Sequence, residues 1–224
     1  MPALRSLDIS DNAIMDAGIR SIIPYFIWAV QKPYPLLDIK LNNCNLSCSG
    51  VADLLRSLST LMEPLNTFSV AENDLGSVVA APLAKFLTSS GVRKLNIEDV
   101  GLGTLGFQQL EDQIPKEMVL QCINISKNRG GIRAAYFISK LLMCAPNIAY
   151  IHAGGNIMPP ESAEVIHDAL IESQGKLEVL DLTGNIKLCQ SDYTARLLEF
   201  EHRGQPFVII PRPSSSSTPY DDDP

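Results

Sequence analysis

The amino-acid sequence predicts an α/β solenoid, in which parallel strands line an inner curve and a helix returns the chain along the outside after each strand. Two observations predict this fold. A run of the form Leu-x-x-Leu-x-Leu-x-x-Asn recurs along the chain and is clearest at residues 177–185. The last position of the run occurs seven times, with spacings of 32, 29, 27, 28, 28 and 29 residues. Such a regular period is typical of repeat architectures, in which each strand-and-helix unit packs against its neighbours.

Each run describes a short strand followed by a turn. Alternate side chains of a strand point to opposite faces, so the leucines face the core and the residues between them face the inner curve. The asparagine that ends the run has a side-chain amide suited to backbone groups left unpaired at the turn. The residues at this position are Asn12, Cys44, Asn73, Val100, Asn128, Asn156 and Asn185. Cysteine is an accepted alternative here, whereas Val100 has lost the polar side chain.

The segments between the runs carry apolar residues at helical spacing and are predicted to be helices. Three of these segments are residues 16–31, 49–62 and 77–88. Pro24 is expected to kink or shorten the first helix. The Pro159-Pro160-Glu161 triplet is typical of a helix start, and Gly175 is typical of a position just past a helix end.

The two ends of the array differ. Residues 191–202 are predicted to form a closing helix and residues 207–210 a final short strand, which would cover the last unit. The first unit begins at Leu4, without room for a cap, so its exposed strand edge suggests a fragment of a longer array or pairing with another molecule. We therefore predict a repeat domain over residues 1–210 and a disordered Ser/Pro/Asp tail over residues 211–224.

Composition argues against several classes of protein. The formal net charge of −7 and the pI of 4.9 disfavour direct nucleic-acid binding, which needs clustered Lys and Arg. The five cysteines are odd in number and scattered, as in proteins of reducing compartments. No secretory signal is visible, and the apolar stretch over residues 19–30 is too short to span a bilayer. We expect a cytoplasmic or nuclear protein.

The seven units resemble the leucine-rich repeats of the ribonuclease-inhibitor-like superfamily, and the resemblance covers residues 4–190. It implies a horseshoe with parallel inner strands and outer helices, in about seven repeats of about 28 residues. Members of this superfamily include the ribonuclease inhibitor, Ran GTPase activators, CARMIL-type regulators of actin capping protein and Tonsoku-type genome-maintenance proteins. No signature of any one member is present, so no functional residue is transferred.

The inner positions of the strands carry mostly small polar residues of mixed sign, which is typical of a hydrogen-bonding surface. A candidate binding site lies at the fourth to seventh units, where a tyrosine stands among adaptable polar residues. Its predicted partner-binding residues are Asn96, Cys122, Asn124, Tyr150, His152 and Asp181. The alternative interpretation is that these are ordinary solvated strand residues.

Catalysis and metal binding are less well supported. Cys122 and His152 lie on neighbouring predicted strands, but nothing supplies an oxyanion hole, and an open solenoid face excludes water poorly. Cys44 and Cys48 are too widely spaced for a zinc knuckle and lack a second ligand pair. We expect no catalytic residue, no metal and no cofactor.

The sequence thus predicts a non-enzymatic scaffold that binds a protein partner through the concave strand face. One alternative is a GTPase-activating or other regulatory module that uses an exposed arginine, such as Arg93 or Arg129. Another is a terminal fragment of a larger repeat protein, serving actin-capping regulation or genome maintenance. Neither direct nucleic-acid binding nor a membrane span is expected.

Overall fold

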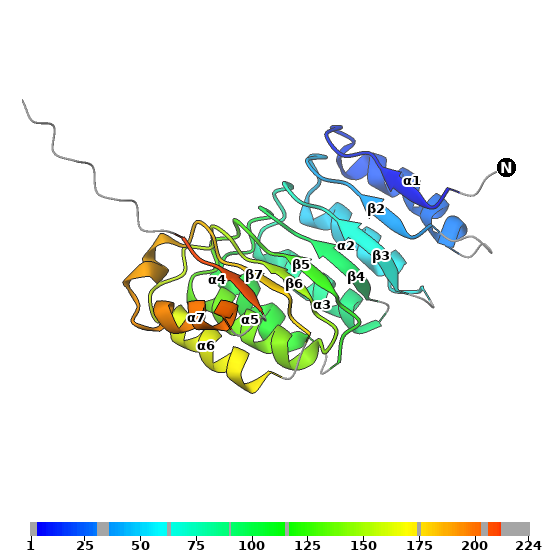
Figure 1. Cartoon of the computed structure of the whole chain (residues 1–224). Helices are drawn as coiled ribbons and strands as arrows, with labels where there is room; N and C mark the ends of the chain where they lie inside the picture. The colour runs from blue at the N-terminus through cyan, green and yellow to red at the C-terminus, as the bar shows by residue number, and fades with distance from the viewer. Residues whose placement is uncertain are drawn as a thin grey trace, which may run out of the picture.

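The computed structural model describes residues 4–30, 36–61, 64–89, 91–114, 117–173, 176–202 and 206–211. These residues form one parallel sheet whose eight strands follow one another in chain order, with the helices in a second layer against it (Figure 1). The strands are β1 (Ser6–Asp8), β2 (Asp38–Lys40), β3 (Leu65–Ser69), β4 (Val92–Asn96), β5 (Cys122–Asn124), β6 (Tyr150–His152), β7 (Val179–Asp181) and β8 (Phe207–Ile209). The helices are α1 (Met15–Val30), α2 (Cys48–Leu58), η1 (Ser77–Val79), α3 (Ala80–Ser89), α4 (Gly103–Gln113), α5 (Ile132–Cys144), α6 (Ser162–Glu172), η2 (Ile186–Gln190) and α7 (Tyr193–His202). The predicted leucine-rich-repeat solenoid is confirmed.

Equivalent positions of successive units pair in register across the sheet. Leu95 pairs with Ile123, which pairs with Ile151 and then Leu180, and all four are buried between sheet and helices. The helices complete this core because one side of each is apolar; α5, for example, buries Phe137. The residues on either side of each buried strand position therefore lie on the opposite face, which we call the concave face.

The turn asparagines form a buried ladder of hydrogen bonds between units. The Oδ1 of Asn156 accepts from the backbone nitrogens of Asn128 at 3.2 Å and Gly130 at 3.4 Å. Its Nδ2 donates to the carbonyls of Ile125 and Ala153, each at 3.0 Å. Asn73, Asn128 and Asn185 make corresponding contacts. The predicted role of this amide is therefore confirmed, and it lies at the joint between two units.

Cys44 occupies the asparagine position of the second unit. Its Sγ lies 3.4 Å from the carbonyl oxygen of Ile9 and 3.3 Å from that of Asn42, and burial raises the pKa of the thiol. All five cysteines are free thiols. Cys44 is thus a core residue of the ladder, as predicted.

Of the two predicted effects of Pro24, the shortening of the first helix does not occur. Pro24 lies inside α1, which continues to Val30, so the proline does not shorten the helix. Pro24 is exposed, so its missing N–H leaves the unpaired helix carbonyl on the solvated side, where the cost is lowest. Smaller differences occur elsewhere: η1 precedes α3, and α6 begins at Ser162, directly after the proline-containing triplet. Gly175 lies outside the described residues, as does the predicted tail from residue 212.

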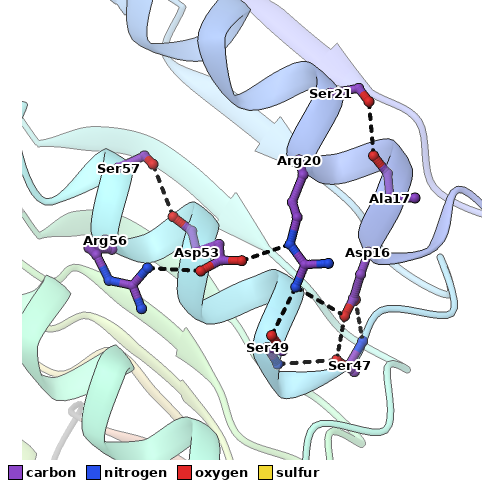
Figure 2. Close-up of polar contacts among 9 residues, drawn as sticks. All are labelled: Asp16, Ala17, Arg20, Ser21, Ser47, Ser49, Asp53, Arg56 and Ser57. Atoms are coloured by element: carbon purple, nitrogen blue, oxygen red, sulfur yellow. Dashed lines mark hydrogen bonds and ion pairs between the residues drawn. The ribbon is translucent and has the colours of Figure 1, made fainter.

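The first unit is less completely packed than the others. Leu7 is in register with the buried Ile39 but is only partly buried, and Asn12 is exposed. A polar network on the outer layer joins this unit to the second. Figure 2 shows Arg20 of α1 between Ser49 and Asp53 of α2, at 2.8 Å from each. Of the described helices, none combines the length and apolar character needed to cross a membrane.

Candidate protein-binding face

The concave face brings the predicted site residues together in two adjacent rows. Asn96, Asn124, His152 and Asp181 pair in register across β4 to β7 and form the polar row. Cys122 and Tyr150 pair with each other in the neighbouring row. Neighbouring parallel strands lie about 4.8 Å apart, so the predicted residues form one continuous patch.

Part of the polar row is engaged in holding the backbone. The Oδ1 of Asn124 accepts from the backbone nitrogen of Ser126 at 3.0 Å, and that of Asn96 accepts from Glu98 at 3.1 Å. The Oδ1 of Asp181 likewise accepts from Thr183 at 2.9 Å. These side chains therefore each use one oxygen to fix the turn after their strand.

An ion pair that the sequence analysis did not identify lies beside the polar row. Lys127 Nζ is 2.7 Å from Glu98 Oε1, and Asn124 Nδ2 donates to Glu98 Oε2 at 2.9 Å. The hydrogen bond from Lys127 is the main cause that lowers the pKa of Glu98, and Glu98 in turn raises the pKa of Lys127. Glu98 and Lys127 therefore lie beside the polar row as an ion pair in which the two charges compensate each other.

His152 lies at an open depression of about 390 Å³ in this face, lined by residues of both signs and by small residues. Its Nδ1 is 3.7 Å from Asp181 Oδ2. Gly154 allows the backbones of the two units to approach, because a Cβ at this position would lie 3.0 Å from the carbonyl oxygen of Thr183. The depression therefore offers carboxylate, imidazole and amide groups on a surface with close backbone packing.

The second row is apolar and extends further than predicted. Tyr150 pairs with Val179, which pairs with Phe207 of β8. Tyr150 is 39% exposed and Phe207 is 48% exposed, so two aromatic rings reach solvent on either side of a half-buried valine. The Tyr150 hydroxyl donates to Glu178, and this hydrogen bond raises the pKa of the tyrosine.

Comparison with known proteins agrees with the repeat architecture. No family model matches the chain. It is 28% identical over 133 residues to the ribonuclease inhibitor of Sus scrofa, and 27% identical over 137 residues to that of Mus musculus. These matches cover 57% and 58% of this chain but only 28% of either inhibitor. The fold is a leucine-rich-repeat solenoid, and these similarities support the resemblance of its repeats to those of the ribonuclease inhibitors.

A solved structure gives the same fold. This leucine-rich-repeat protein superposes on a chain in the crystal structure of the Rad7 and Elc1 complex of yeast with a TM-score of 0.51 and 17% sequence identity. The superposition covers 76% of this chain and 40% of the other. This superposition supports the solenoid fold. Both the yeast chain and the two inhibitors are much longer than the part that this chain matches.

The arrangement of Cys122 does not suit nucleophilic catalysis in this repeat protein. Burial raises the pKa of its thiol, whereas a reactive cysteine needs a lowered one. Cys122 also pairs with Tyr150, while His152 pairs with Asn124 in the other row. The two groups considered as a catalytic pair thus occupy different rows of the sheet.

The two arginines considered for a regulatory role lie in different environments. Arg93 is half-buried and donates to the carbonyl oxygen of Pro64 at 3.4 Å, so its guanidinium is partly occupied within the fold. Arg129 is exposed at the turn that follows β5, where it lines a depression of about 650 Å³ at the loop edge.

Proposed function

We propose that this leucine-rich-repeat protein is a non-enzymatic scaffold that binds a protein partner on its concave face. The residues proposed to contact the partner are Asn96, Cys122, Asn124, Tyr150, His152 and Asp181. One observation carries this proposal: the exposed rings of Tyr150 and Phe207, on either side of the half-buried Val179, lie in register beside the polar row. Aromatic anchors beside adaptable polar groups are the usual composition of a protein-binding hot spot.

The rigidity of the sheet supports the same function. The strands that carry the two rows are tied together by backbone pairing and by the buried ladder of Asn128, Asn156 and Asn185. A surface held in this way loses little conformational entropy on binding, which favours affinity. The relatives are consistent with a binding role, since ribonuclease inhibitors are named for their action on another protein and Rad7 was solved in a complex with Elc1.

A reducing compartment suits the proposal. The five cysteines are free thiols, and partly exposed thiols persist best where disulfide formation is suppressed. We therefore infer that binding takes place in the cytoplasm or nucleus.

The test is affinity capture from a cell extract, followed by identification of the proteins recovered. The wild-type chain is compared with a Tyr150→Ala, His152→Ala double variant, and with Met143→Ser, which alters an exposed side chain on α5. Circular dichroism first establishes that all three are folded. Loss of a specific partner in the double variant alone supports the concave face. Equal recovery by all three proteins contradicts it.

A further inference from the structure

Two large aliphatic side chains are exposed on adjacent turns at the loop edge of the solenoid. Ile157 follows the ladder residue Asn156 and is 58% exposed, and Ile186 follows Asn185 and is 73% exposed. The backbone nitrogen of Asn156 donates to the Oδ1 of Asn185 at 2.8 Å, so the two turns are directly joined. Single exposed aliphatic residues are ordinary, but a pair on adjacent units makes a shared apolar surface.

The backbone of Ile157 makes this exposure more informative. Its φ is +58°, a left-handed conformation that β-branched residues rarely adopt. The equivalent position also has a positive φ in the second, fourth and fifth units, where it is Asn45, Gly101 and Arg129, so the left-handed conformation belongs to the repeat turn. Among these residues, the β-branched isoleucine suits the conformation least, and its side chain contributes nothing to the core. An unfavourable residue at an exposed position favours a role in binding.

The charge of the loop edge changes along the array. The two positions that flank each ladder residue carry carboxylates in the first, third and fourth units, namely Asp11, Glu72, Asp74 and Asp99, and two asparagines in the second. In the fifth to seventh units these two positions carry no carboxylate and include Lys127 and Arg129.

The cations nearest in position to the isoleucine pair remain available to a partner. Arg129 follows the ladder residue of the fifth unit, one unit before Ile157, and Lys187 directly follows Ile186. Both are exposed, and among the described residues neither forms an ion pair, whereas Lys127 is held by Glu98. Glu161, at the start of α6, is the carboxylate closest in sequence to Ile157. Arg129 thus lies one unit before the isoleucine pair, and Lys187 lies beside Ile186 in η2.

We propose that Arg129, Ile157, Ile186 and Lys187 form a second docking surface, separate from the concave face. Its occupant is a segment of a partner protein in which an aliphatic or aromatic side chain is flanked by Asp or Glu. The apolar side chain packs against the two isoleucines and the acidic groups pair with Arg129 and Lys187. This surface does not depend on the proposed function of the concave rows.

The test uses a phage-displayed library of short random peptides, selected on the wild-type chain. Selected peptides are synthesised and their affinities measured for the wild type, an Ile157→Gly, Ile186→Ser double variant, and Arg129→Glu. Selected peptides are expected to combine an apolar residue with Asp or Glu. Each variant is expected to weaken their binding roughly tenfold or more. The melting temperature of an Ile157→Gly single variant should not fall, because glycine suits the positive φ.

Two controls separate this surface from other sites. Val78→Ser removes an exposed aliphatic side chain elsewhere, and Tyr150→Ala alters the concave face. Binding that is lost in Tyr150→Ala and kept in the isoleucine variant would overturn the inference while leaving the proposed function intact. Equal loss in Val78→Ser, peptides without acidic residues, or no peptide above background would also overturn it.

Discussion

Asp53 of α2 accepts a hydrogen bond from Arg20 of α1 at 2.8 Å, and this contact joins the outer layers of the first two units (Figure 2). Arg20 also donates to Ser49, and Arg56 of α2 pairs with the other oxygen of Asp53 at 2.8 Å. Arg20 therefore joins α1 to α2 on the outer layer of a unit whose strand residue Leu7 is only partly buried.

We expect Arg20→Ala to loosen the first unit more than the rest of the solenoid. Exposed ion pairs contribute roughly 0.2–1 kcal/mol, so the free energy of unfolding should fall by about 1 kcal/mol or less. Hydrogen exchange should accelerate in α1 and remain unchanged in α5, because repeat units open locally. The matched control is Arg56→Ala, which removes a pair within α2 alone. Equal acceleration of α1 exchange in both variants would contradict this role of Arg20.

The contacts of Asp53 with Arg20 and Arg56 predict that stability depends on pH. The hydrogen bonds from Arg20 and then Arg56 hold the pKa of Asp53 below its ordinary value of 3.8. A carboxyl group whose pKa is lowered by folding contributes stability above its unfolded pKa, and that contribution disappears as pH falls through the folded value. Urea unfolding of wild type and Asp53→Asn from about pH 6 to about pH 2 should therefore converge at the acidic end. A constant difference across this range would count against the prediction.

Asn156→Ala should be among the most destabilising single substitutions. It removes one acceptor and one donor group that serve buried backbone atoms of two units, including the nitrogens of Asn128 and Gly130. Each buried polar group left unsatisfied costs about 1–3 kcal/mol. We therefore expect the free energy of unfolding, measured with urea, to fall by more than about 3 kcal/mol. Asn12→Ala is the control, because Asn12 is exposed and its side-chain Nδ2 donates to the carbonyls of Ile9 and Ser10 in its own turn. The free energy of unfolding of Asn12→Ala should fall by less than about 1 kcal/mol.

Gly130→Ala should disturb the packing of the helices. A Cβ at Gly130 would lie 2.4 Å from Cδ2 of Phe107, which is buried against Phe137 with ring centroids 5.7 Å apart. Overpacking of this kind costs about 1–3 kcal/mol, and a lower melting temperature would reveal it. Gly103→Ala gives the comparison, since Gly103 has a φ of +60° but open space around it. Gly103→Ala thus reports the cost of backbone conformation alone, and an unchanged melting temperature for Gly130→Ala would contradict the clash, since Gly130 has no positive φ.

Much of the fold could be predicted because each unit repeats the same local pattern. The position of Asn156 in its run identified a turn, and equal spacing implied that equivalent positions pair in register. The patch of Asn124, Tyr150 and His152 followed from that register alone. Its role in binding stays a prediction.

Other parts of the candidate site depended on information that the repeat does not contain. The Glu98–Lys127 pair requires the direction of two long side chains at the turn, which periodicity does not specify. Phe207 lies in a strand that departs from the repeat pattern, so the sequence did not indicate its register. Only the pairing of β8 with β7 in the structure shows that Phe207 lies opposite Val179. The continuity of α1 through Pro24 depended on which side of the helix was solvated.

The hydrogen bonds of the asparagine ladder all run in the same direction along the chain. The amide of Asn185 completes the turn that contains Asn156, and the amide of Asn156 completes the turn that contains Asn128, 28 residues earlier. Wherever the next unit has an asparagine at this position, a turn is thus finished by a residue that lies later in the chain. During synthesis on the ribosome, a newly emerged unit therefore keeps its turn open to water until about one further repeat has been translated, and closure proceeds from the N-terminal units toward the C-terminal ones.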